Sequence, residues 1–137
     1  LQAAILLPKL EIFDSEIKER QEVAARYSTA LKDIVKVPHV PDGLLSAWAQ
    51  YAVVTDKRDS YLDKLKALGI PTAVYYPRPL HLQTAFSYLG YRQGDFPVAE
   101  QTSDRIFSLP MYSYLDSSDQ NKIIEAVKKA HEDISRG

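Results

Sequence analysis

The chain has 137 residues, and its 17 basic and 18 acidic residues are well mixed, which leaves a formal net charge of −1. This length suits one domain, and no basic stretch predicts binding to nucleic acid. The chain has no cysteine, which excludes disulfides and thiolate catalysis and fits a reducing cytoplasm. No apolar run reaches the ~18 residues that a membrane-spanning helix needs, so no membrane contact is expected.

Helices dominate the predicted N-terminal part. Residues 1–7 are apolar on nearly all sides, which is typical of a helix covered on several faces. Phe13 with Asp14-Ser15 predicts a hydrophobic staple and an N-cap, and an imperfect apolar stripe then predicts a helix to about Lys36. Because the chain begins with leucine inside a predicted helix, we expect it to be a fragment of a longer protein.

A strand and a helix are predicted next. The strand covers residues 47–55, where strict alternation would put Trp48 and Gln50 on the same face. Trp48 is expected in the core, whereas Gln50 could face either a ligand or solvent. A helix over residues 57–68 is predicted to end at Gly69, which can adopt a left-handed backbone.

The segment after this helix carries the candidate site. Its β-branched and aromatic residues predict a strand over residues 72–76, which Pro77 and Pro79 end because neither has a backbone N–H. Polar groups on a stiff segment past a strand end can point into a cleft. The polar side chains concentrated here belong to Tyr75, Tyr76, Arg78, His81 and Gln83.

The remaining elements complete the predicted fold. Asp95 is expected to cap a helix that runs to about Arg105, a short strand follows over residues 106–109, and a last helix has Val127 facing inward and His131 facing water. This order predicts an α+β fold, in which helices pack on one face of a small, mostly antiparallel sheet.

Common catalytic motifs are absent from the sequence. No Gly-rich nucleotide loop, HExxH or GxSxG pattern occurs. The histidines, at positions 39, 81 and 131, are too dispersed to predict a metal site. The residues alone therefore assign no catalytic and no metal-binding side chain.

Five blocks of the sequence resemble one enzyme family in their order and spacing. The blocks are LQAA (1–4), SAWAQY (46–51), YYPRPLHLQ (75–83), FPVAE (96–100) and LPM (109–111). They are similar to segments of the DegT/StrS-type nucleotide-sugar aminotransferases, which use pyridoxal phosphate (PLP) and have the aspartate-aminotransferase fold. The members that look most similar act on UDP-linked 3-keto sugar acids. Tyr75 departs from the family pattern, because many members have histidine there.

The resemblance implies a division of the chain and a set of contacts. Residues 1–36 would be a helical segment that leads from a missing large domain, and residues 37–137 would be the C-terminal small domain. Tyr75, Tyr76 and His81 would bind the nucleotide-sugar substrate. The parent enzyme, expected to be a cytoplasmic homodimer, would move an amino group from an amino acid such as glutamate to a nucleotide-linked keto-sugar in polysaccharide or glycan biosynthesis.

The family's PLP-binding lysine lies in a Ser-rich motif of the large domain, and that motif does not occur here. We therefore expect the chain alone to bind no PLP and to be inactive, with no catalytic and no cofactor-binding residue of its own. The residues leave open a stand-alone α+β module that binds a small ligand or a protein. A hydrolase built on His81 ranks last, because it lacks a nucleophile and an orienting acid.

Overall fold

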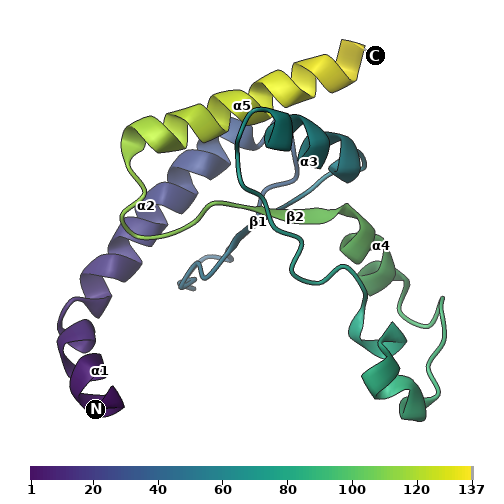
Figure 1. The fold of residues 1–137 in the computed structure, drawn as a ribbon, viewed down its shortest axis with the longest axis horizontal. Helices are drawn as coiled ribbons and strands as arrows, with labels where there is room; N and C mark the ends of the chain where they lie inside the picture. Colours follow the sequence, from purple (N-terminus) through teal and green to yellow (C-terminus); the bar gives the residue numbers. More distant parts are fainter. Residues whose placement is uncertain (137) are drawn as a thin grey trace.

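The protein is arched, with its compact part at the top of the arch. A computed structural model describes residues 1–136 (Figure 1). The elements are α1 (Gln2–Glu11), α2 (Phe13–Leu31), β1 (Tyr51–Val54), α3 (Arg58–Ala67), the 3-10 helices η1 (Leu80–Leu82) and η2 (Thr84–Leu89), α4 (Pro97–Arg105), β2 (Ile106–Leu109) and α5 (Ser117–Arg136). Helix α1 extends away at one end, and η1, η2 and α4 extend at the other. None of the described helices is long and apolar enough to cross a membrane.

The sheet consists of two short strands under three helices. Strands β1 and β2 run antiparallel, with Tyr51 opposite Leu109. Helices α2, α3 and α5 gather on the same side of this pair in Figure 1. A two-stranded ribbon is at best marginally stable in water, so its stability comes from packing against these helices. The predicted α+β fold is confirmed.

The strand predicted over residues 72–76 is reduced to one bridge. The Ala73 amide donates to the Ser108 carbonyl at 3.2 Å, and the Ser108 amide donates to the Ala73 carbonyl at 2.8 Å. Pro71 precedes this bridge and Pro77 follows it, and neither has an N–H to extend a ladder. The residues after Ala73 therefore leave the edge of the sheet.

One hydrophobic core joins the helices to the strands. Its largest fully buried side chains come from five elements and are Tyr27, Leu31, Tyr51, Val53, Tyr61, Leu65, Phe107 and Val127. The Tyr27 hydroxyl donates to the Pro110 carbonyl at 3.0 Å. The Tyr61 hydroxyl lies 2.8 Å from His131 Nδ1, so the prediction that His131 faces water is wrong. Buried phenols need such partners, since an unpaired one costs free energy.

The helix boundaries near the N-terminus differ from the prediction. Helix α2 begins at Phe13, and Ser15 lies inside it and donates to the Ile12 carbonyl at 2.7 Å instead of capping the helix. The helix ends at Leu31, and Lys36, which was predicted to lie near its end, exchanges two backbone hydrogen bonds of 3.0 Å with Val54 of β1. In α1 no residue is buried.

The predicted strand over residues 47–55 begins only at Tyr51, because Trp48 bends the chain. Trp48 has a φ of +48°, a left-handed conformation that a non-glycine residue rarely adopts. Its side chain is 9% exposed and belongs to the same core as Tyr51. Strict alternation would have put Trp48 on the face opposite Tyr51.

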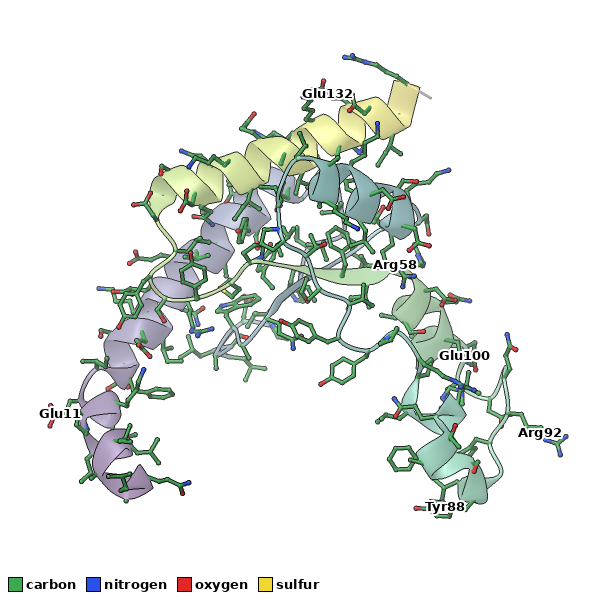
Figure 2. The ribbon with its side chains drawn as sticks, in the orientation of Figure 1. Glu11, Arg58, Tyr88, Arg92, Glu100 and Glu132 are labelled. Carbon is green, nitrogen blue, oxygen red and sulfur yellow. The ribbon has the colours of Figure 1, made fainter. Side chains whose placement is uncertain are left out.

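Residues 80–105, here called the arm, are tied to the compact part near the end of α4. Arg58 Nη1 donates to the Ser103 carbonyl at 2.7 Å, and the Thr55 amide donates to the Arg105 carbonyl at 3.0 Å. Tyr88 and Arg92 lie at the far end of the arm in Figure 2. The arm therefore projects from the edge of the sheet, while its base is held by Thr55, just after β1, and by Arg58, the first residue of α3.

We expect Leu65→Ala to lower the free energy of unfolding by about 2–5 kcal/mol, because it leaves a cavity among fully buried side chains. Leu44, which is 67% exposed, offers a matched control. Leu44→Ala should change the free energy of unfolding by less than about 0.5 kcal/mol. Urea unfolding of both variants measures the difference, and equal effects would contradict the assigned core.

Candidate functional site

Tyr75 and Tyr76 lie a few residues before the arm, where the chain has just left the sheet. They are 56% and 66% exposed, respectively. Their backbone lies between the bridge at Ala73 and the rigid Pro77. The two phenols are therefore held on a constrained segment and remain open to a ligand.

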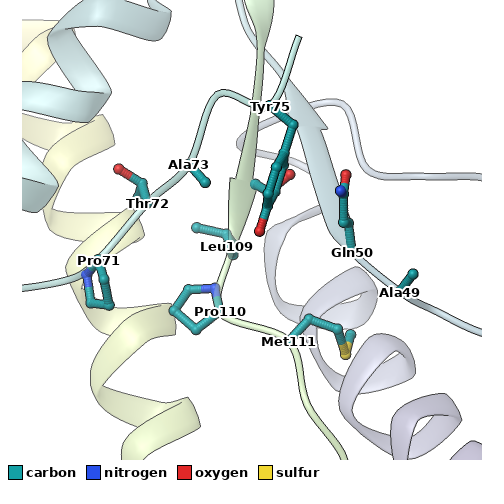
Figure 3. Close-up of a pocket in the computed structure, with 10 residues that line it drawn as sticks. Ala49, Gln50, Pro71, Thr72, Ala73, Tyr75, Leu109, Pro110 and Met111 are labelled. Carbon is teal, nitrogen blue, oxygen red and sulfur yellow. The ribbon is translucent and has the colours of Figure 1, made fainter.

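Tyr75 faces a small hollow beside the sheet, which we name the Gln50 hollow (Figure 3). It has a volume of about 200 Å³ and is formed by residues 49–50, 71–73 and 108–111 together with Tyr75. Apart from the Tyr75 phenol, none of these lining residues is ionisable. The hollow can therefore offer hydrogen bonds to a neutral group but no charge to an anion.

Tyr76 faces a different and larger space, which we name the Arg78 groove. It has a volume of about 680 Å³ and runs between residues 76–80 and the start of α4. Its walls are largely apolar, and Arg78 and Asp95 are the charged residues among those that line it. Guanidinium groups bind phosphate and carboxylate well, so this groove suits a ligand with an anionic part.

His81 contacts neither space and lies inside the arm. Its Nε2 atom donates to Glu100 Oε1 at 3.0 Å, and its side chain is only 8% exposed. Its ring packs on Phe96 with the ring centroids 4.8 Å apart. In this conformation His81 contributes to the internal structure of the arm, and a role for it in substrate binding stays a prediction.

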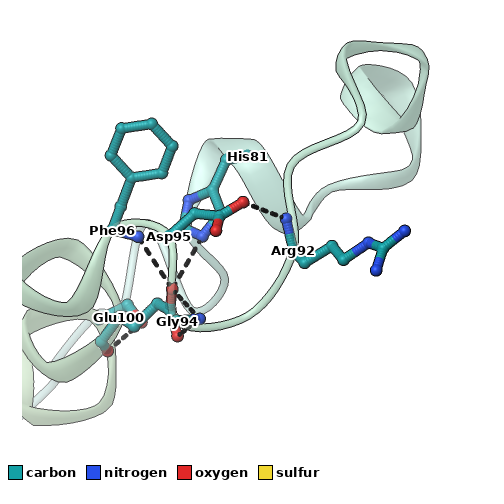
Figure 4. Close-up of polar contacts among 7 residues, drawn as sticks. His81, Arg92, Gly94, Asp95, Phe96 and Glu100 are labelled. Carbon is teal, nitrogen blue, oxygen red and sulfur yellow. Dashed lines mark hydrogen bonds and ion pairs between the residues drawn. The ribbon is translucent and has the colours of Figure 1, made fainter.

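Glu100 is the centre of a set of hydrogen bonds that the sequence did not reveal (Figure 4). The Gly94 amide donates to both of its carboxylate oxygens, at 2.9 and 3.0 Å, and the Phe96 amide donates to one of them at 3.3 Å. With His81, these bonds form what we call the Glu100 clasp. The clasp holds the loop before α4 against the segment that carries His81.

The prediction that Asp95 caps α4 is wrong. The residue before the helix is Phe96, and the Asp95 carboxylate accepts instead from the Arg92 amide at 2.7 Å. Glu100, in the first turn of α4, accepts from the amide of Phe96, the residue before the helix, as the acidic residue of a capping box does. In the sequence, the signal for this role of Glu100 was an acidic residue in the first turn of the predicted helix.

The charge of Glu100 is favoured by the clasp. Burial by itself raises the pKa of Glu100, but hydrogen bonds from the Gly94 amide, His81 and the Phe96 amide outweigh that effect. Its pKa therefore lies below the ordinary value of 4.5. An ionised Glu100 can accept all of these hydrogen bonds at neutral pH.

The described residues do not fit PLP. Every lysine of the chain is exposed except the half-buried Lys128, which pairs with Glu125 at 2.9 Å. No lysine lines the Gln50 hollow or the Arg78 groove. PLP chemistry needs a lysine held in an enclosed site, and residues 1–136 offer none. Within the same range, no three His, Asp or Glu side chains gather as metal ligands would.

Comparison with known proteins places this geometry among sugar aminotransferases. The profile of the DegT/DnrJ/EryC1/StrS aminotransferase family matches residues 1–128. A relative from Pseudomonas aeruginosa, UDP-2-acetamido-2-deoxy-3-oxo-D-glucuronate aminotransferase, is 46% identical over 86% of this chain and 32% of its own length. The chain thus spans about a third of the length of the curated relatives that it matches.

Solved structures agree with the sequence matches. A DegT DnrJ EryC1 StrS aminotransferase from Brucella abortus is 48% identical, with a TM-score of 0.89 over 95% of this chain and 35% of its own. DesV from S. venezuelae, solved in complex with a ketimine intermediate, is 31% identical, with a TM-score of 0.92 over 96% of this chain and 36% of its own. Both likenesses extend over nearly all of the fold described above.

We expect the Glu100 clasp to weaken in acid. Because the pKa of Glu100 is lowered in the folded state, the clasp stabilises the arm above the ordinary pKa of 4.5, and this stability is lost as pH falls through the folded-state pKa. The Gly94 amide chemical shift, followed by NMR, should titrate with a midpoint below 4.5. Glu100→Gln should abolish that titration, whereas Glu22→Gln, at an exposed position on α2, should not. A midpoint at or above 4.5 would contradict the assignment.

Proposed function

Because this chain belongs to the DegT/DnrJ/EryC1/StrS aminotransferase family, we propose that it is the substrate-facing small-domain part of a PLP-dependent sugar aminotransferase. The whole enzyme would transfer an amino group from an amino acid, such as glutamate, to a keto-sugar carried on a nucleotide. The family match over residues 1–128 carries this proposal. The product would enter polysaccharide or glycan biosynthesis in the cytoplasm.

The two exposed phenols support a role in substrate binding. Tyr75 and Tyr76 leave the sheet on a rigid segment and face two neighbouring spaces of different chemistry. A nucleotide sugar has neutral rings joined by an anionic diphosphate, and it would need both kinds of surface. The Arg78 groove offers a guanidinium beside the Tyr76 phenol, which suits the anionic part.

The substrate class follows the relative from Pseudomonas aeruginosa, whose name specifies a UDP-linked 3-oxo-glucuronate. We propose that a UDP-linked keto-sugar acid is also the substrate here. Such a substrate adds a carboxylate to the diphosphate, and Arg78 would be available to either anion. Other relatives act on dTDP-linked sugars, so the choice of nucleotide depends on the 46% identity to this relative.

Helix α1 supports the proposed division of the chain. It carries exposed apolar side chains, among them Leu6, Leu7 and Leu10, at 60–65% exposure. An apolar face of this kind marks a contact surface. We propose that a large domain, which would hold PLP and its lysine, covers residues 1–13, and that two such subunits form a homodimer.

The 137-residue chain alone should show no transaminase activity. Residues 1–136 present no enclosed lysine, so added PLP would lack the group that attaches it during the reaction. The measurement is amino transfer from glutamate to a UDP-linked 3-keto sugar acid with PLP present. The full-length relative from Pseudomonas aeruginosa serves as the positive control. Turnover by the purified chain would contradict the proposal that a separate large domain holds PLP and its lysine. It would indicate instead that the chain is an enzyme by itself.

Tyr76→Phe should weaken binding of UDP-N-acetylglucosamine, a stable stand-in for the substrate. The loss of one hydrogen bond to a charged group, worth about 1.5–3 kcal/mol, corresponds to a Kd that is at least roughly tenfold higher. NMR titration of the labelled chain measures the Kd, and the amides of residues 75–81 should shift. Tyr88→Phe is the matched control, because Tyr88 is 79% exposed at the far end of the arm. If these amides stay still while others move, the binding site lies elsewhere, as in the alternative of a stand-alone binding module.

A further inference from the structure

Gln50 lies in the Gln50 hollow with a polar group that no neighbour uses. It is half-buried and shares the hollow with Tyr75 (Figure 3). The nearby hydrogen bonds belong to Gln21, Ser46 and Trp48. Within the described chain, none of the hydrogen bonds involves the Gln50 amide. An amide can donate and accept at once, so it suits a ligand that carries both kinds of group.

The segment before Gln50 is held in a strained conformation by helix α2. A left-handed backbone at a residue such as Trp48 costs about 1–3 kcal/mol and persists only where its surroundings enforce it. Arg20 Nη1 donates to the Trp48 carbonyl at 2.8 Å, and the Trp48 indole donates to Gln21 Oε1 at 2.8 Å. Gln21 also donates to the Ser46 carbonyl.

This bend determines which way Gln50 faces. In an unbroken strand, Trp48 and Gln50 would share a face, so burying the indole would also direct Gln50 to the core. The left-handed turn at Trp48 separates the two, because the indole joins Tyr51 in the core while Gln50 lines the hollow. Strained residues of this kind are concentrated at functional sites.

The size and polarity of the hollow limit its ligand. Whole-ligand pockets usually enclose about 300–1,000 Å³. At about 200 Å³, the Gln50 hollow holds only part of a nucleotide sugar. It offers no cation to a diphosphate, and its polar groups include the Gln50 amide and the Tyr75 phenol. These groups fit a neutral ring with hydrogen-bond donors and acceptors.

We infer that Gln50 and Tyr75 form a subsite for one neutral polar ring of the nucleotide sugar, with Gln50 as a specificity-determining residue. This inference depends on the proposed function, because it divides the same substrate between two spaces. Arg20 and Gln21 are positioning residues, since they hold Trp48 and do not line the hollow. In the proposed substrate the sugar carries a carboxylate, so the neutral ring is the base, whose donors and acceptors the Gln50 amide can meet.

NMR titration of the full labelled chain with UDP-N-acetylglucosamine tests the subsite. The Gln50 side-chain amide signals should shift, and inorganic phosphate should leave them in place. Uridine, added alone, should shift them as well, whereas N-acetylglucosamine, added alone, should not. Gln50→Ala should raise the Kd by about tenfold, the equivalent of one or two hydrogen bonds. Gln50→Glu keeps the shape of the side chain but removes its donors, and it should also weaken binding.

Two further variants make the test specific. Gln101→Ala, at an exposed position on α4, should leave the Kd unchanged. Gln21→Ala should raise the Kd although its side chain does not line the hollow, while a purely structural role would lower the melting temperature and leave the affinity unchanged. If the Gln50→Ala and Gln50→Glu variants both bind UDP-N-acetylglucosamine as tightly as the unaltered chain does, the subsite is wrong and the proposed function stands. If the unaltered chain binds neither the nucleotide sugar nor its parts, the subsite and the proposed function are both wrong.

Discussion

The position of strand β2 between two partners is the constraint on which the rest of this structure depends. On one side β2 pairs with β1, and on the other Ser108 exchanges two backbone hydrogen bonds with Ala73. The first pairing brings residues 49–50 beside 108–111, and the second brings Tyr75 to the same place. Strand β2 therefore holds the two walls of the Gln50 hollow, residues 49–50 and Tyr75, next to each other.

The helices make this short sheet possible. Four paired residues on each strand could not hold themselves together in water, so α2, α3 and α5 supply the buried apolar area. Helix α2 has a second role, because Arg20 and Gln21 fix the bend at Trp48. One helix therefore contributes both to the core and to the geometry of the candidate site.

The arm shows that a candidate site residue can also make internal contacts. His81, which is predicted to bind substrate, faces Glu100 and Phe96 inside the arm. The family blocks at 75–83 and 96–100 are thereby joined to each other by the Glu100 clasp. Tyr75 and Tyr76, at the start of the first block, are exposed, and Arg78 lines the same groove as Tyr76 and supplies a positive charge there.

The sequence alone determined the features that depend on local chemistry. Gly69 ends a helix with a φ of +74°, the helix over 58–67 and the strand over 106–109 lie where their patterns predicted, and the five blocks pointed to the family. Only the tertiary structure decided how far the strand at Ala73 extends, which way Gln50 faces and what His81 contacts. Those outcomes depend on partners distant in sequence, namely Ser108, Arg20 with Gln21, and Glu100, and neither periodicity nor residue preference records a hydrogen bond to a residue far along the chain.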